Sequence, residues 1–208
     1  MRPFFFGIRG YFYNSSLQSA SVPTVVTLRK AKLLPSDELL NLALRALGSR
    51  AHSTGELKEK LRKRAARQED VDAVLAKLKQ AGYLDDRRFA EHYASARLEN
   101  EGFGKMRVLR DLRQRRVAGN LAEQVTERAY KDTDEVRLIE DFLKRKYRGK
   151  QLGPFLAEEK NLAAAFRRLR YAGFSAGASI RVLKRYARQP EALDALESDQ
   201  AESQGEES

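Results

Sequence analysis

The chain has 208 residues with no cysteine, 42% hydrophobic and 33% charged residues, and a formal net charge of +11. The lack of cysteine excludes disulfides, thiolate catalysis and cysteine-ligated zinc, and no apolar run approaches the ~18 residues that a membrane span requires. Leu, Ala, Arg, Lys and Glu dominate the middle of the chain, where glycine and proline are sparse, so the composition favours helices.

The positive charge is concentrated in the middle of the chain. Residues 1–35 contain five basic and no acidic residues, whereas residues 191–208 contain seven acidic and no basic residues. Subtracting these +5 and −7 charges from +11 leaves +13 for residues 36–190. Such an excess favours a polyanionic partner, most often nucleic acid, although Lys and Arg also serve simply to solvate exposed helix faces.

The two ends of the chain differ in composition from its middle. Residues 1–35 are predicted to be a disordered leader, because Gly7, Arg9 and Gly10 interrupt the apolar opening before it reaches the roughly 7–15 residues of a secretory signal. A likeness to an organelle transit peptide and a start placed too far upstream stay open as alternatives. A strand over Thr24–Leu28 would have no obvious partner. Residues 191–208 form an acidic tail of low apolar content, which we expect to be disordered.

Three short helices are predicted between residues 36 and 84. The first begins with Ser36 as its N-cap and ends at Gly48. The second begins at Ser53, and the spacing of Ser53 and Glu56 matches a capping box, in which each side chain bonds the backbone N–H of the other residue. The third covers about residues 69–81 and runs into Gly82.

The run from Gly82 onward indicates a tight corner between two helices. Gly82 can adopt the left-handed conformation that closes a helix C-terminus. Tyr83 and Leu84 are expected to pack back on the helix that has just ended. Asp85 or Asp86 can accept hydrogen bonds from the free N–H groups of the next helix, so both aspartates are predicted to be structural caps.

After this corner the same order of elements recurs. Helices are predicted over residues 87–100, from residue 105 and from about residue 120, with Gly102–Gly104 breaking the first from the second. Asp132 is predicted to cap a seventh helix, which a loop from Arg148 to Pro154 follows. An eighth helix is predicted to hold the apolar residues Leu162, Ala165, Phe166 and Leu169, and Gly173–Ser175 begins the ninth.

Three apolar positions repeat in register along these helices. The positions taken as equivalent are Leu61, Leu112 and Leu169, then Ala66, Val117 and Phe174, then Val74, Val125 and Val182. The leucine positions lie 51 and 57 residues apart, and the loop near residue 150 accounts for the longer spacing. A repeat of this length predicts an all-α fold, an elongated tandem array of three three-helix units at about residues 36–84, 85–131 and 132–190.

Four segments of the chain, together about residues 36–190, resemble the RecX family of regulators of the RecA recombinase. They are Ala51–Leu57 with Leu61, Gly82–Ala90, Gly102–Gly104 with Arg107, Leu109 and Leu112, and Gly173–Ser175 with Val182–Lys184. The structural motif residues among them are Gly82, Asp85, Asp86, Phe89, Gly102 and Gly104. The family usually carries glycine between the last two helices of a unit; Ala65 and Arg116 replace it here, and only Gly173 keeps the pattern.

The resemblance implies a non-enzymatic modulator of DNA repair and the SOS response. Such a protein binds the RecA filament on single-stranded DNA and inhibits its recombinase, ATPase and coprotease activities. We expect a cytoplasmic monomer that needs no cofactor and no membrane, and that can also contact single-stranded DNA. The alternative from the residues alone is an autonomous, basic helical protein that binds nucleic acid.

The sequence contains no recognisable catalytic, cofactor-binding or metal-binding constellation. His52 is expected to support a helix cap, and His92 to pack at the margin of an apolar face. Gly104 and Lys105 lack the neighbours of a phosphate-binding loop, since Glu99 and Met106 occupy the places of its first glycine and its Ser or Thr.

Three groups of cations are the candidate binding residues. In the first, Arg107, Arg110 and Arg113 fall opposite an apolar face at ~100° per residue. The second is Arg167, Arg168 and Arg170 with Arg181, Lys184, Arg185 and Arg188; the third is Lys144, Arg145, Lys146, Arg148 and Lys150. Reversing the first group to Glu is expected to weaken filament binding without unfolding the protein. Tyr147 and Tyr171 stand beside cations and are secondary candidates for contact with nucleic acid.

Overall fold

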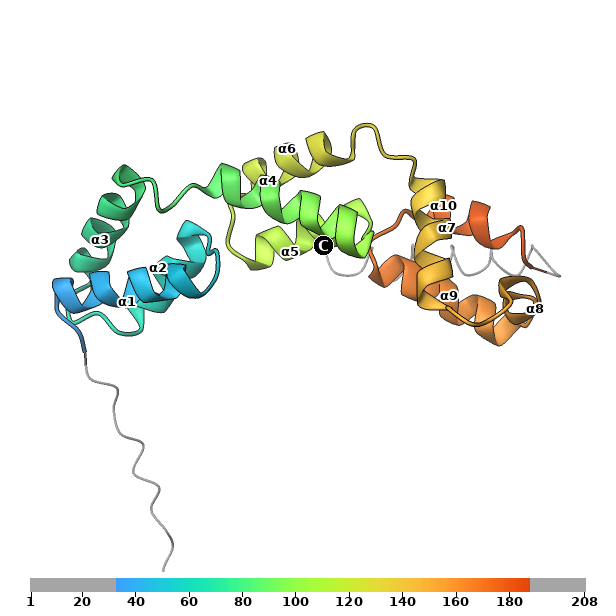
Figure 1. Cartoon of the computed structure of the whole chain (residues 1–208), viewed down its shortest axis with the longest axis horizontal. Coiled ribbons are helices and arrows are strands. Elements are labelled where there is room, and N and C mark those ends of the chain that lie inside the picture. Colours follow the sequence, from blue (N-terminus) through green and yellow to red (C-terminus); the bar gives the residue numbers. More distant parts are fainter. Residues whose placement is uncertain (1–32, 188–208) are drawn as a thin grey trace, which may run out of the picture. The chain divides into compact units, whose positions relative to one another are not determined.

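The computed structural model describes residues 33–187, and this part of the chain is helical, with no strand (Figure 1). The helices are α1 (Ser36–Ser49), α2 (Thr54–Arg62), α3 (Gln68–Gln80), α4 (Asp86–Ala96), η1 (Arg97–Glu101), α5 (Lys105–Gln114), α6 (Gly119–Tyr130), α7 (Glu135–Lys146), α8 (Leu152–Leu156), α9 (Glu159–Tyr171) and α10 (Ala176–Leu183). The predicted all-α class is confirmed. Residues 1–32, with the suggested strand at Thr24–Leu28, and the tail at 191–208 lie outside the described residues.

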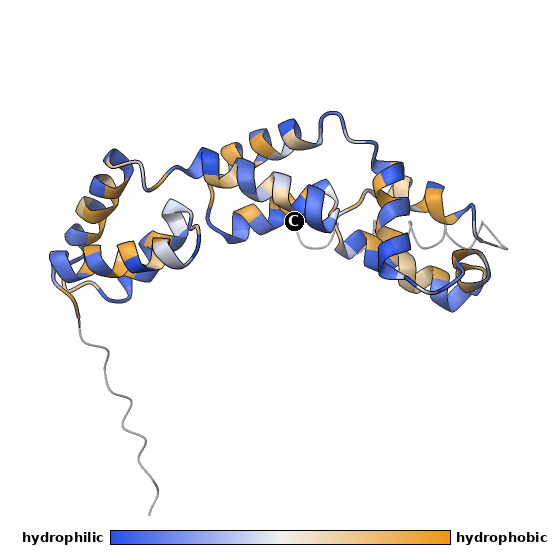
Figure 2. Ribbon diagram, viewed as in Figure 1, coloured by the Kyte–Doolittle hydropathy of each residue, from blue (hydrophilic) through white to orange (hydrophobic). Residues whose placement is uncertain are grey.

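The helices pack around three apolar clusters that follow one another along the chain. The first is built from residues between 34 and 84, the second from residues between 90 and 125, and the third from residues between 139 and 183. Along each helix apolar residues alternate with polar ones (Figure 2), as burial of one helix face requires. None of the helices between residues 33 and 187 is long and apolar enough to span a membrane.

The burial of side chains follows the predicted register. Leu61, Leu112 and Leu169 are each 0% exposed, and the three valines thirteen residues later are also buried. Val117 and Phe174 are buried as expected, whereas Ala66 is exposed. Ala65 is buried in its place, so the first helix set departs from the register by one residue at this turn.

The cause of this departure lies in how the turns between helices close. Arg116 and Gly173 both have left-handed backbones, with φ of 58° and 90°. The residue after each donates its N–H to a carbonyl five residues back, at 3.1 Å in both cases, the pattern of a Schellman turn. Ala65 instead forms an isolated β-bridge with Leu34. Arg116 thus makes the left-handed turn that glycine usually makes at this position. At Ala65 the β-bridge takes the place of that turn.

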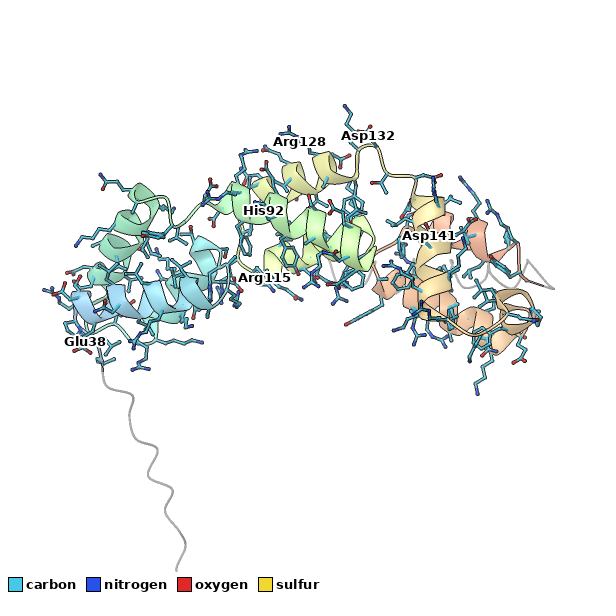
Figure 3. All side chains as sticks on the ribbon, viewed as in Figure 1. Glu38, His92, Arg115, Arg128, Asp132 and Asp141 are labelled. Atoms are coloured by element: carbon cyan, nitrogen blue, oxygen red, sulfur yellow. The ribbon has the colours of Figure 1, made fainter. Side chains whose placement is uncertain are left out.

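Two predicted helix caps are wrong. Pro35 occupies the N-cap of α1, with no side-chain cap, and Ser36 already lies within the first turn. Asp134 caps α7 and accepts hydrogen bonds from the N–H groups of Val136 and Arg137, at 3.0 and 3.3 Å. Asp132 lies in the turn that precedes this cap (Figure 3). A cap must be the residue directly before the first helical turn, and the sequence pattern misplaced that residue at both sites.

Three local expectations also need correction. The last three residues of the loop predicted from Arg148 to Pro154 belong to the helix α8. The helix predicted over 87–100 ends in the π-helical turn η1. Gly102, with φ of 55°, closes that turn. Tyr83 is 61% exposed and does not pack back on α3, because Leu84 alone, at 5% exposure, enters the first core.

Arg116 offers a direct test of the left-handed turn. We expect Arg116→Gly to raise the free energy of unfolding by about 1 kcal/mol, because relief of the left-handed backbone exceeds the entropic cost of glycine. Its ion pair with Glu59 is exposed and long, at 3.7 Å, so its loss matters little. Urea unfolding measures the change. Ala65→Gly is the control: it should destabilise, and a gain in stability there would contradict this account.

Candidate functional site

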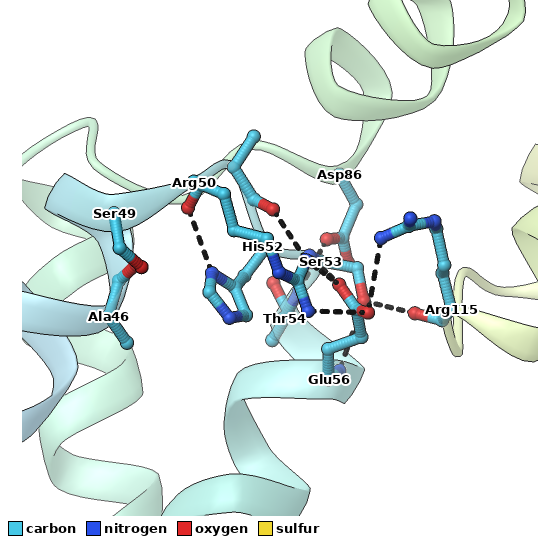
Figure 4. A network of polar contacts seen from close by, with 10 residues as sticks. Ala46, Ser49, Arg50, His52, Ser53, Thr54, Glu56, Asp86 and Arg115 are labelled. Carbon is cyan, nitrogen blue, oxygen red and sulfur yellow. Dashed lines mark hydrogen bonds and ion pairs between the residues drawn. The ribbon is translucent and has the colours of Figure 1, made fainter. Parts of the chain in front are cut away.

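The start of α2 contacts the end of α5, about sixty residues later in the chain (Figure 4). Ser53 forms the predicted capping box with Glu56, and its Oγ also donates a hydrogen bond to the carbonyl of Arg115. The Glu56 carboxylate accepts further hydrogen bonds from Arg50, at 3.2 Å, and from Arg115, at 3.3 Å. Burial acts to raise the pKa of Glu56, but hydrogen bonds from Arg50 and the Ser53 N–H outweigh it and hold the pKa below its usual value.

The two aspartates of the corner cap different helices. Asp85 accepts a hydrogen bond from the N–H of Arg88, at 3.0 Å, and caps its own helix α4. Asp86 Oδ1 accepts a hydrogen bond from the N–H of Thr54, at 2.7 Å, and so reaches the first turn of α2. Asp85 thus caps the helix that follows the corner, as predicted. Asp86 serves the earlier helix instead and ties α4 to the start of α2 across 32 residues.

The start of α5 contacts the end of α9 in the same way. Gly104 N–H donates to the carbonyl of Ala172 at 2.8 Å, and Met106 N–H donates to the carbonyl of Gly173 at 3.1 Å. In the register of the repeat, Gly104 corresponds to Ser53 and Ala172 corresponds to Arg115. We call these two contacts the first joint (α2 on the α5–α6 turn) and the second joint (α5 on the α9–α10 turn).

Glycines allow the backbones to meet at both joints. A Cβ added to Gly55 would lie 2.4 Å from the carbonyl oxygen of Arg116. At the second joint, a Cβ on Gly104 would lie 2.3 Å from the carbonyl of Gly173, and one on Gly173 would lie 2.1 Å from the backbone nitrogen of Arg107. These distances are far below van der Waals contact, so no larger residue fits without a backbone shift.

Phe103 adds apolar contact to the second joint. Its side chain packs against both the second and the third core clusters. Its carbonyl accepts a hydrogen bond from the Tyr130 hydroxyl at 2.7 Å, and burial raises the pKa of that hydroxyl.

The first predicted cation group is largely engaged at the second joint. Arg107 Nε bonds Asp111 Oδ1 at 3.0 Å, and its guanidinium lies 4.7 Å from the centre of the Tyr171 ring. Arg110 donates to the carbonyl of Tyr171 at 3.1 Å, and Arg113 pairs with a glutamate of α6 at 2.6 Å. Burial acts to lower the pKa of Arg107, but hydrogen bonds to Tyr171 and Asp111 outweigh it and raise the pKa. Reversing all three arginines to Glu would therefore disturb the joint as well as the surface.

The other two cation groups are partly engaged. Arg145 donates to the carbonyls of Asn100 and Glu101, at 3.1 and 2.8 Å. Further partners are Asp141 for Lys144 at 3.4 Å, the Tyr147 hydroxyl for Arg168 at 3.4 Å, the Phe174 carbonyl for Arg170 at 2.5 Å, and Glu140 for Arg185. Lys184 is exposed. Arg167 and Arg181 are exposed and form no hydrogen bond or ion pair with residues 33–187. Arg188 lies outside this range.

The two histidines share a groove that sequence reasoning did not foresee. A groove of about 690 Å³ between α1 and α4 is lined by Leu44, Leu47, Phe89 and Tyr93, with His52 and His92 also at its wall. The two histidines are forty residues apart, and no spacing signal links them. Across residues 33–187, no three His, Asp or Glu side chains are grouped as ligands of a metal ion.

Substitution at the second joint tests the need for close backbone contact. We expect Gly104→Ala to lower the free energy of unfolding by about 2 kcal/mol, because the added methyl meets backbone atoms of Gly173 and Phe174 that cannot rotate away. Gly119→Ala, at the start of α6, is the control, since nothing lies within 4 Å of its Cβ. Equal stability of the two variants by urea unfolding would refute the close contact.

The pH dependence of stability tests the environment of His52. Burial lowers the pKa of His52, although its hydrogen bond to the Arg50 carbonyl opposes this. The unfolded chain then binds the proton more strongly, so stability is full above pH about 6.5 and falls as the pH decreases below it. We expect His52→Gln to reduce the loss of stability between pH 7.5 and 5.5. The exposed His92, changed to Gln, is the control, and an unchanged pH slope in His52→Gln would contradict the prediction.

Comparison with known proteins identifies relatives over most of the described residues. Models of the first and second three-helix domains of RecX match residues 40–78 and 85–125. Regulatory protein RecX of Trichlorobacter lovleyi is 33% identical over 128 residues, which cover 62% of this chain and 81% of the relative. Regulatory protein RecX of Pseudomonas fluorescens is 32% identical over 133 residues, covering 64% of this chain and 81% of the relative.

Solved structures agree on the fold. The crystal structure of RecX from Lactobacillus salivarius superimposes with a TM-score of 0.55 at 19% identity and covers 73% of this chain and 96% of that chain. A second crystal structure of regulatory protein RecX gives a TM-score of 0.53, also at 19% identity, and covers 71% of this chain and 70% of that chain. From the two matched domain models and the aligned relatives, the chain belongs to the RecX family of regulatory proteins.

Proposed function

We propose that this protein binds the filament that RecA forms on single-stranded DNA and inhibits its recombinase, ATPase and coprotease activities. Membership of the RecX family is the observation that carries the proposal, because it implies regulation of RecA. The direction of regulation, inhibition, is the further step. The protein would act by binding, as a cytoplasmic monomer, and without an enzymatic reaction of its own.

The charge of the helical part supports an anionic partner. Residues 36–190 carry +13 once the two ends are subtracted from the net charge. Arg167 on α9 and Arg181 on α10 are exposed and have no partner within residues 33–187. A guanidinium without an internal partner keeps all its donors available to the phosphates of a nucleic acid or the carboxylates of a protein.

The two candidate functions predict different binding preferences. A regulator of the filament should prefer RecA-coated DNA to bare DNA. An autonomous nucleic-acid-binding protein should show no such preference and should lose affinity steeply with salt. Competition between bare single-stranded DNA and RecA-coated DNA at two salt concentrations therefore separates the two functions.

The function is tested by ATP hydrolysis of RecA on single-stranded DNA, titrated with this protein. We expect the rate to fall in a saturable way, because the bound protein restrains the filament. The double variant Arg167→Glu, Arg181→Glu should need a several-fold higher concentration for the same inhibition, since it reverses two charges that have no partner within residues 33–187.

The matched control is Arg128→Glu. Arg128 is an exposed arginine of α6 outside the three predicted cation groups (Figure 3). Its reversal should leave the inhibition close to that of the unmodified protein. If wild-type protein changes neither the ATPase rate nor the filament length, the proposed function is wrong. If Arg128→Glu weakens inhibition as much as the double variant, overall charge and not the chosen residues would explain the effect.

A further inference from the structure

Tyr171 is an aromatic side chain held in place at the surface. It is the last residue of α9 and is 68% exposed, although large apolar groups normally gain stability from burial. The guanidiniums of Arg107 and Arg110 lie 4.7 and 5.6 Å from the centre of its ring. Arg110 also donates to the Tyr171 carbonyl at 3.1 Å, so ring and backbone are fixed together.

Two arginines lie over the Tyr171 ring, yet most of the residue stays exposed. Arg107 is itself held by Asp111, at 3.0 Å, and its side chain is only 22% exposed. With the ring fixed by cation–π contact and most of the residue still open to solvent, an incoming flat group would not have to order it first. This arrangement is pre-organised for stacking.

The surroundings of the ring favour a nucleic acid over an apolar protein segment. Arg167 lies four residues before Tyr171 in α9, hence on the same helix face, and is exposed with no partner within residues 33–187. Arg110 gives one N–H of its guanidinium to the Tyr171 carbonyl, and four others remain. An exposed aromatic ring beside Arg167 and the unused N–H groups of Arg110 is the combination that binds single strands, with bases on the ring and phosphates on the cations.

We propose that Tyr171 is a stacking platform for one base of single-stranded DNA, with Arg167 and Arg110 contacting the neighbouring phosphates. The inference deepens the proposed function, since a RecA filament supplies such a strand. It also separates the two tyrosines that the sequence treats alike. Tyr147 is 8% exposed and packs against Phe155 with ring centres 4.9 Å apart, so it has no room for a base.

The absence of tryptophan from the chain allows a single fluorescent reporter. In Tyr171→Trp we expect a single-stranded oligo-dT to quench the fluorescence in a saturable way, because the base stacks on the indole. An oligonucleotide of the same length with abasic sites should bind without this quenching. The control is Tyr83→Trp: Tyr83 is 61% exposed, and no cation lies over its ring in the part of the chain that the structure describes.

Affinity for the oligonucleotide gives a second readout. We expect Tyr171→Ala to bind oligo-dT about tenfold more weakly than the unmodified protein, and Tyr171→Phe to bind equally well, because stacking needs the ring and not the hydroxyl. Circular dichroism should show unchanged helicity for both, since the side chain is exposed. Equal affinity of Tyr171→Ala and wild type would overturn the proposal.

The outcomes separate this site from the proposed function. Quenching by oligo-dT and not by the abasic strand supports stacking, whatever the effect on RecA. No quenching, or equal quenching by the abasic strand or in Tyr83→Trp, overturns stacking even if the protein still inhibits RecA. If the fluorescence of the Tyr171→Trp variant changes with RecA and not with oligo-dT, stacking is overturned too, because the ring would then dock a protein segment.

Discussion

The hydrogen bonds of the second joint connect two helix ends whose backbone groups need partners. The N–H groups at the start of α5 and the carbonyls at the end of α9 have no partner within their own helices. They bond each other instead: the Gly104 N–H donates to the Ala172 carbonyl at 2.8 Å, and the Met106 N–H donates to the Gly173 carbonyl at 3.1 Å. The positive end of one helix dipole also faces the negative end of another. The first joint differs in its donor, because there the side-chain hydroxyl of Ser53, and not a backbone N–H, bonds the carbonyl of Arg115.

The second joint also explains why some of the predicted binding arginines are needed for the fold. Arg107 is part of the joint, through Asp111 and through the backbone that meets Gly173, and Arg110 holds the end of α9. On the basic face of α5, two of the three predicted binding arginines are therefore engaged at the second joint. Arg167 has no such role within residues 33–187 and lies one helical turn from the exposed ring of Tyr171. Arg110 keeps for a partner the N–H groups that its bond to Tyr171 does not use.

Much of the fold could be predicted because its signals are local. Helix periodicity, the Ser53–Glu56 capping box and the left-handed Gly82 each depend on a few neighbouring residues. The equivalent leucines and valines could be found because each must be buried in its own cluster. Caps at Ser36 and Asp132 were misplaced by one or two residues because several polar residues near a helix start satisfy the same pattern.

The sequence by itself determined the helical class, the register of the repeat and the resemblance to the RecX family, since composition, spacing and short motifs carry that information. Only the tertiary structure decided which cations remain available and which aromatic side chains stay exposed. Tyr147 and Tyr171 both stand beside cations in the sequence, yet one is buried against Phe155 and the other is open between arginines. The position of Tyr171 depends on contacts with arginines about sixty positions away, which no local pattern encodes.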